Sequence, residues 1–192
     1  KVKAQLLGEA CESWLRELSD KLDFNEPITQ PIPIFLYRNQ RDFSKATGAA
    51  KPGRVLGRAS TSGIIELDAS EVLAPVGQIA GHEITHVLVF QILGENSRDL
   101  PLWFNEGTAK YLTNDWDKID RITLANAITD NKVLPLSSIT YNFPKGDEES
   151  LAYSQSTSAI QFFVKKYGLA KLARVIHTTG QLGSFEAAMK EV

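Results

Sequence analysis

The pentapeptide His82-Glu83-Ile84-Thr85-His86 lies inside the longest apolar stretch of the chain, Val76 to Leu93. This stretch is long enough for a helix of several turns, and a helix projects residues four apart from the same face. His82 and His86 would then sit one turn apart, a geometry that lets two neutral imidazole nitrogens bind one tetrahedral zinc ion. Glu83 lies about 100° around the helix from His82, where it can hydrogen-bond a metal-bound water without pointing at the metal.

A second predicted helix offers a third metal ligand, twenty residues after the pentapeptide. Glu106 falls in the middle of Leu100 to Leu112, where Asp99 is a candidate N-cap and Pro101 suits the first turn. Gly107 costs a helix about 1 kcal/mol relative to alanine, which indicates a close approach to another backbone. We therefore expect this helix to lie tight against the first and to complete a His2Glu site with its fourth position open to water.

These residues resemble those of the gluzincin metallopeptidases. The stretch Trp103 to Ala109 is similar to the third-ligand helix of the aminopeptidase N group and, more closely, to that of the smaller peptidase MA-like domains of bacteria. The resemblance implies that His82, His86 and Glu106 bind one zinc ion and that Glu83 is the general base.

The resemblance is most specific from Gln78 to Leu112 and looser from Pro31 to about Gly168, and it has two departures. The chain lacks the Gly-Ala-Met-Glu-Asn motif with which aminopeptidases hold the amino terminus of a substrate, so an endopeptidase is favoured over an exopeptidase. Lys110 stands four residues after Glu106, where thermolysin-like enzymes carry an aspartate that supports a zinc-binding histidine, so that role has no candidate here.

A tyrosine is expected to stabilise the oxyanion, because the resembling domains use one in the region of Tyr153. A phenol suits this task, since it donates one hydrogen bond without competing as a strong metal ligand. Tyr141 is the alternate candidate, and a packing or surface role for Tyr153 remains open.

Strand signals are concentrated before the predicted helix that carries His82 and His86. Ile32 to Arg38 is expected to be a buried strand, and Arg54 to Thr61 with Gly63 to Leu67 a β-hairpin. In zincin folds the strand nearest the active-site helix is an edge strand that pairs with extended substrate, so the resemblance implies that this hairpin forms the rim of the cleft. A purely structural hairpin is the alternative.

The rest of the chain is predicted to be mainly helical, with Val2 to Leu22 amphipathic and a short helix from Asn39 to Thr47 that ends at Gly48. Four residues of the helix Asp115 to Thr129 are expected to point inward: Trp116, Ile119, Ile122 and Ile128. A helix that starts at Asp147 or Ser150 and runs to Tyr167 has a predicted core stripe of Ile160, Phe163, Val164 and Tyr167. Its successors are a helix over Leu169 to Ile176, a loop over Thr178 to Gly180 and a helix-like Ser184 to Val192.

We therefore predict an α+β, zincin-like fold for a single catalytic domain over residues 1–192. A small, mainly antiparallel sheet and the active-site helix, at about residues 24–94, would lie above the cleft. A helical half, at about residues 95–192, would lie below it.

Composition excludes some functions. With 21 basic and 23 acidic side chains and 43% hydrophobic residues, the chain has no electrostatic bias toward nucleic acid or anionic membrane, and no stretch is expected to span a bilayer. The lone Cys11 is expected in the core, and His177 has no ligand partner at helical spacing. Because the sequence begins with Lys1 and shows no signal sequence, we expect an extracellular or periplasmic location only if a targeting segment was removed.

The predicted function is zinc-dependent hydrolysis of peptide bonds in a peptide or protein substrate, with one zinc ion per chain. Three alternatives remain. The domain could bind zinc and serve as an interaction module without turnover, or be a latent zymogen held inactive by its N-terminal helix. In the third alternative the two histidines only satisfy hydrogen bonds in a core, which is costly for three ionisable side chains in an apolar helix without a strong partner.

Overall fold

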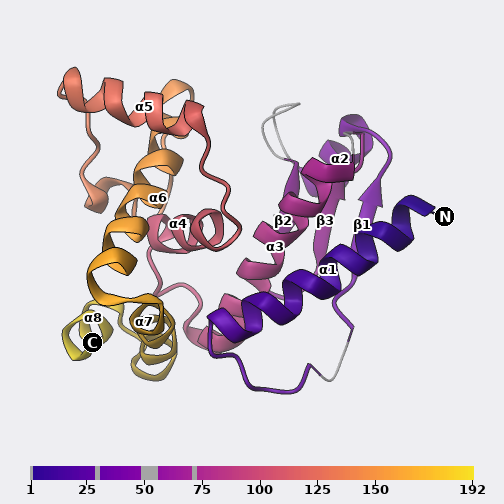
Figure 1. Cartoon of the computed structure of the whole chain (residues 1–192), viewed down its shortest axis with the longest axis horizontal. Helices are drawn as coiled ribbons and strands as arrows, with labels where there is room; N and C mark the ends of the chain where they lie inside the picture. The colour runs from indigo at the N-terminus through magenta and orange to yellow at the C-terminus, as the bar shows by residue number, and fades with distance from the viewer. Residues whose placement is uncertain (1, 29–30, 49–55, 71–72) are drawn as a thin grey trace. The chain divides into compact units, whose positions relative to one another are not determined.

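The computed structural model of the protein describes residues 2–28, 31–48, 56–70 and 73–192, and this part of the chain is mostly helical with one small sheet, an α+β fold. In chain order the elements are α1 (Val2–Lys21), β1 (Ile34–Tyr37), α2 (Gln40–Thr47), β2 (Gly57–Ala59), β3 (Ile65–Asp68), α3 (Leu73–Leu93), η1 (Gly94–Asn96), α4 (Leu102–Leu112), α5 (Lys118–Thr129), η2 (Leu136–Ile139), α6 (Asp147–Tyr167), α7 (Leu169–Leu182) and α8 (Phe185–Glu191) (Figure 1). The chain folds as two compact units, residues 1–91 and 92–192.

The sheet belongs to the first unit and has the strand order β1-β3-β2. The predicted hairpin is present as β2 and β3, which pair antiparallel with Gly57 opposite Leu67, while Arg54 and Val55 lie outside the described residues. The prediction of a mainly antiparallel sheet is wrong. β1 runs parallel to β3, because the chain from β1 crosses through α2 before it returns, and parallel neighbours require such a crossover.

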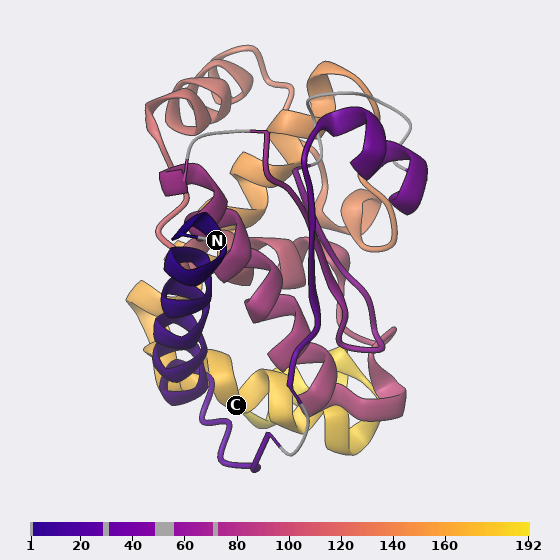
Figure 2. The same ribbon diagram turned by 90° about the vertical axis from the view of Figure 1, so that its right-hand side faces the viewer.

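The two faces of the sheet are covered differently. Figure 2 shows α3 and α1 on one side of the strands and α2 on the other. Ile65 and Leu67 of the central strand are fully buried on the side of α3. On the opposite side, the rings of Tyr37 and Phe43 of α2 meet edge to face, with centroids 5.9 Å apart.

β1 is an edge strand, and the expectation of a buried strand is wrong. Phe35 is 52% exposed. The neighbouring Leu36 is 39% exposed. The apolar run was interpreted as a buried strand, but β1 is flanked by a strand on one side only, so its side chains lie at the margin of the sheet.

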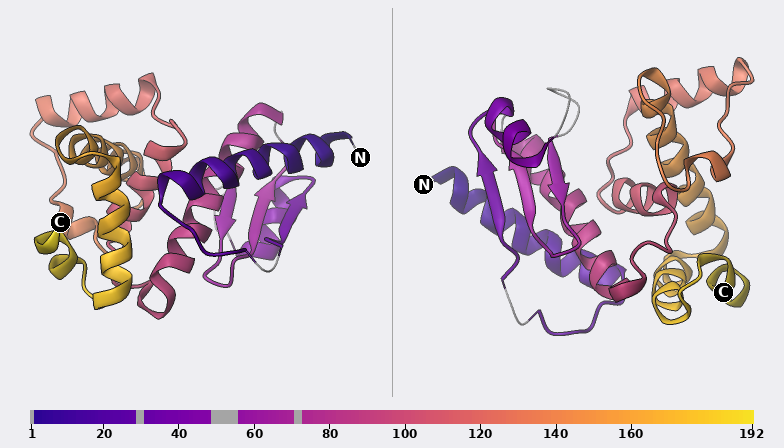
Figure 3. Two further views of the ribbon diagram at one scale, coloured as in Figure 1. Left: turned by 60° about the horizontal axis from the view of Figure 1, so that its bottom comes forward. Right: turned by 180° about the vertical axis from the view of Figure 1, so that it is seen from behind.

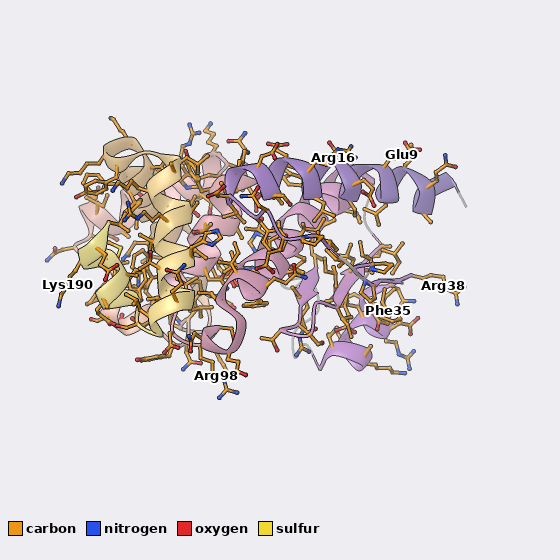
Figure 4. The ribbon with its side chains drawn as sticks, turned by 90° about the horizontal axis from the view of Figure 1, so that it is seen from below. Glu9, Arg16, Phe35, Arg38, Arg98 and Lys190 are labelled. Carbon is orange, nitrogen blue, oxygen red and sulfur yellow. The ribbon has the colours of Figure 1, made fainter. Side chains whose placement is uncertain are left out.

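α1 confirms the predicted amphipathic helix. Leu7, Leu18 and Leu22 are buried, whereas Glu9 and Arg16 lie on its outer side (Figure 4). Cys11 is also buried, as expected.

We expect Cys11 to react slowly in the folded protein. Burial, with a smaller contribution from the charge of Glu12, raises the pKa of its thiol to about 11, which lowers the thiolate population at pH 8 by about 100-fold. The greater nucleophilicity of a high-pKa thiolate offsets only part of this loss. Iodoacetamide at pH 8 should therefore alkylate Cys11 at least about tenfold more slowly than in the chain unfolded in guanidinium, as followed by mass spectrometry. Equal rates in the two states would contradict this prediction.

α2 begins and ends where local chemistry predicts. The side chain of Asn39 accepts a 2.9 Å hydrogen bond from the backbone N–H of Asp42, which caps the first turn. Gly48 ends the helix at a φ of 70°, a left-handed conformation that favours glycine.

In the second unit α6 is the central helix and packs against α4, α5 and α7, with α8 lying on α7 (Figure 3). Phe104 of α4 anchors this core, with ring centroids 6.2 Å from Phe163 of α6 and 5.0 Å from Phe185 of α8. α6 has the predicted bounds, but Tyr167 of its predicted core stripe is half exposed, because the helix ends there at Gly168.

The prediction that α5 buries its isoleucines is wrong. Ile119 is 72% exposed, and Ile122 and Ile128 are also exposed, while Trp116 lies before the helix and is half-buried. The face of α5 turned inward carries instead the carboxylate of Asp120, which has polar partners on two other helices. Periodicity of apolar residues therefore identified this helix but not its buried face.

The predicted loop over Thr178 to Gly180 is wrong, since α7 continues through these residues. Thr179 donates a 2.8 Å hydrogen bond from Oγ1 to the carbonyl of Val175, which is compatible with a helix. A Cβ at Gly180 would lie 2.6 Å from the carbonyl oxygen of Ile92, so this glycine permits close packing inside the helix and does not end it. The end is at Gly183, with a φ of 61°.

Among the residues that the structure describes, no helix is both long and apolar enough to cross a membrane.

Candidate metal centre

His82 and His86 converge on one point beside α3. Their Nε2 atoms are 3.0 Å apart, and the two rings are nearly perpendicular at 80°. The helix that holds them is apolar on all sides, with Ile84, Val87 and Leu88 buried, as is typical of a helix inside a domain. The spacing of four residues alone brings the rings to the same side, so this half of the site is local to α3.

The histidine pair fits a bound zinc ion. Two Zn–N bonds of about 2.0–2.1 Å at a tetrahedral angle place the nitrogens about 3.3 Å apart, a few tenths of an ångström more than the distance between these Nε2 atoms. The same distance allows one neutral ring to donate a hydrogen bond to the other. A small ring rotation converts the hydrogen-bonded pair of rings into a metal-binding pair. The two imidazole nitrogens are therefore suited to a divalent metal without rearrangement of the helix.

Glu83 is buried, with 6% of its surface exposed, and it lies on the side of α3 that faces β2. A buried carboxylate is costly unless a cation or hydrogen-bond donors compensate its charge. Its place one residue from His82 puts this side chain about 100° around the helix from that histidine.

α1 packs on another side of α3 from the histidines. A Cβ built on Gly81 would lie 2.8 Å from the ring of Trp14, and Ala10 lies against Gly77. These two glycines are about 140° and 180° around the helix from His86. The part of α1 that makes these contacts therefore does not cover the histidine side of α3, which gives no support to the alternative in which the N-terminal helix blocks the site.

Glu106 lies in the middle of α4, as the sequence predicts, and it is half-buried. The predicted cap is wrong. Pro101, and not Asp99, occupies the N-cap position, and it makes no side-chain cap hydrogen bond. The backbone N–H of Leu102 instead donates a 2.7 Å hydrogen bond to the carbonyl of Thr140, so a distant loop satisfies the start of the helix.

Gly107 makes the close backbone approach that its sequence position predicts, although the neighbour is α6. A Cβ here would lie 2.5 Å from the carbonyl oxygen of Ser156 and 2.7 Å from its carbonyl carbon. The glycine is therefore explained by the packing of α4 on α6, and it is not evidence of tight packing against the first helix.

Gly107→Ala should destabilise the second unit. Alanine gains about 1 kcal/mol of helix propensity, but its methyl group meets backbone atoms of Ser156 that cannot rotate away, and overpacking costs about 1–3 kcal/mol or more. We expect a lower denaturation midpoint in urea.

Gly8→Ala is the matched control for Gly107→Ala. It is also a glycine inside a helix, and its Cβ would meet nothing within 4 Å, so this variant should be unchanged or slightly more stable. Equal midpoints for the two variants would contradict the packing assignment.

Lys110 has a structural role that the sequence did not reveal. Its Nζ lies 3.2 Å from Asp120 of α5 and 3.5 Å from Asp115. Ser154 of α6 donates a 2.8 Å hydrogen bond to the other oxygen of Asp120. The position where thermolysin-like enzymes carry an aspartate therefore helps to link α4, α5 and α6.

The two candidate tyrosines differ in how they are held. Tyr141 is 81% exposed. Tyr153, in the second turn of α6, is half-buried, and its ring lies edge-on to Phe143 with centroids 4.8 Å apart. A fixed ring suits an oxyanion donor better than an exposed one, so Tyr153 stays the preferred prediction.

Sequence reasoning missed Gly57, which was interpreted only as part of a strand. A Cβ on this residue would lie 2.6 Å from Oε1 of Glu83. An isolated glycine within a strand pattern indicates a close approach by another part of the chain, so the sequence contained a signal but not the identity of the neighbour.

Comparison with known proteins gives three results. The chain is 26% identical over 176 residues to the uncharacterized protein YhcO of Bacillus subtilis (strain 168), a match that covers 84% of this chain and 52% of YhcO, so the chain spans about half the length of that relative. No solved structure matches this chain significantly. The family model of the Peptidase MA superfamily matches residues 21–192. Because this match covers most of the sequence, the chain belongs to the Peptidase MA superfamily.

Proposed function

We propose that this protein is a zinc-dependent endopeptidase of the gluzincin type, in which His82, His86 and Glu106 hold one zinc ion. The observation that carries the proposal is the convergence of the two Nε2 atoms, 3.0 Å apart, in a chain of the Peptidase MA superfamily. Because the chain belongs to this superfamily, a peptidase-related function is the one that the histidine pair fits best. The position of Glu106, half-buried in the middle of its own helix and twenty residues after His86, supports it as the third ligand.

Each residue has a role suited to its chemistry. A bound zinc ion would supply Lewis acidity toward a carbonyl oxygen and would lower the pKa of a coordinated water. Glu83 accepts the proton of the attacking water and passes it to the leaving amine, which a carboxylate beside a dication can do because it stays ionised between turnovers. Tyr153 donates a hydrogen bond to the developing oxyanion.

We further propose that residues 1–192 form one zincin-like catalytic domain, and that its substrate is a peptide or protein held in an extended conformation. The absence of the Gly-Ala-Met-Glu-Asn motif from the sequence supports internal cleavage. A zinc-binding interaction module without turnover is the competing function, and it would share the same ligands.

Two measurements on the wild-type chain test the proposal. Protein loaded with zinc and then desalted should retain one zinc ion per chain by elemental analysis. A mixture of peptides blocked at both ends should then be cleaved, and a chelator should stop the cleavage. Zinc retained without any cleavage would favour the interaction module, and failure to retain zinc would remove the basis for both functions.

A further inference from the structure

Gly57 lies in the edge strand β2, at a place where this strand lies close to α3. It pairs with Leu67 of β3, so the side on which it would carry a side chain is the side of the sheet that α3 covers. A Cβ built on Gly57 would lie 2.6 Å from Oε1 and 2.9 Å from Cγ of Glu83, and 2.6 Å from Cγ2 of Ile79. These distances are far below ordinary contact, so the space of the missing side chain is already filled.

The backbone does not explain this glycine. Gly57 is not among the glycines with a positive φ, and it is paired in a regular antiparallel strand that any residue could adopt. Gly63, in the turn that follows β2, is different, because its φ of 80° favours glycine. Among the described residues, the demand on Gly57 is therefore one of volume, and the nearest atoms in that volume belong to Glu83 and Ile79.

We propose that Gly57 is a positioning residue for Glu83. The strand backbone lies close to the carboxylate, and any side chain at position 57 would push that carboxylate out of its place. The steric part of this inference rests on contacts within the first unit alone. Its consequence for catalysis rests on the proposed function, in which Glu83 is the base.

A single methyl group is enough to test the idea. To restore the 3.4 Å of an ordinary contact, Oε1 of Glu83 would have to retreat about 0.8 Å from a Cβ at position 57. A general base must stay within hydrogen-bond reach of the proton it accepts, and small misplacements of catalytic groups cost large factors in rate. The carboxylate is the far end of a flexible side chain, so it should move while α3 stays in place.

The collision with Ile79 has to be removed to isolate the effect on Glu83. Ile79→Ala deletes the Cγ2 atom that the new methyl group would meet, so of the three nearest atoms the double variant Gly57→Ala/Ile79→Ala retains the two of Glu83. Ile79→Ala alone is the matched control, because it has the same truncation and the native glycine. The comparison between these two variants separates positioning of the carboxylate from general loss of packing.

The first readout is crystallographic and needs no activity. In the double variant the Glu83 carboxylate should be displaced by about 0.8 Å or more relative to Ile79→Ala, with the Nε2 atoms of His82 and His86 unmoved. A carboxylate that keeps its position would overturn the proposal.

The second readout is kinetic. Zinc content should be equal in the two variants, while kcat for a blocked peptide should be at least tenfold lower in the double variant, with little change in KM. Equal kcat values would overturn the catalytic consequence. If neither variant nor the wild type cleaves peptide, the proposed function fails, and the crystallographic comparison still decides whether Gly57 positions Glu83.

Discussion

Glu83→Gln is expected to retain its zinc ion and to lose peptide hydrolysis by about 10²–10⁴-fold, the range that a general base contributes. Glutamine has nearly the same shape as glutamate, so the buried surroundings of this side chain should tolerate it. Its amide cannot accept a proton from water, however, so the chemical step loses its base. Elemental analysis measures the zinc content of the wild type and of Glu83→Gln, and initial rates on a blocked peptide measure their hydrolysis.

The control for this variant is Glu191→Gln, an exposed residue at the end of α8 that makes the same change of charge. It should hydrolyse peptide at the wild-type rate. Wild-type turnover by Glu83→Gln would show that another group accepts the proton, whereas loss of zinc from this variant would show that Glu83 holds the metal and not the water.

Glu106→Ala is expected to lose zinc rather than to slow the reaction of a loaded enzyme. Removal of a carboxylate ligand leaves two protein ligands. Zinc affinity should therefore fall by more than the roughly 100-fold that is typical when a residue that hydrogen-bonds a metal ligand is mutated. Zinc affinity can be measured by competition with a chromophoric chelator. Helix α4 should survive, because alanine is a better helix former than glutamate and Glu106 is not fully buried.

Circular dichroism would check the folding of Glu106→Ala, with Glu191→Ala as its charge control. Zinc affinity equal to that of the wild type would remove Glu106 from the ligand set. The histidine pair would then need a third partner from elsewhere in the chain.

What the sequence could predict best were features set within one or two helical turns. The pairing of His82 with His86 depends only on the pitch of α3, and the ends of α2 depend on Asn39 and Gly48, whose caps act on immediate neighbours. Glu106 was likewise placed correctly in the middle of a helix from local signals. These predictions are confirmed because their geometry is set by bonds between residues close in sequence.

Features that depend on distant neighbours were decided by the tertiary structure. The exposed face of α5 follows from the partners of Asp120, and the place of Gly180 inside α7 is explained by its close contact with Ile92. The direction of β1 beside β3 follows from the crossover through α2.

The candidate site shows the same division. The sequence by itself determined the histidine pair, the adjacent carboxylate and a second helix that carries Glu106. Only the tertiary structure showed that Gly107 makes room for α6 and that Gly57 makes room for Glu83. A glycine shows in the sequence that space is needed, but the atoms that fill the space come from parts of the chain far away in sequence, and only folding brings them there.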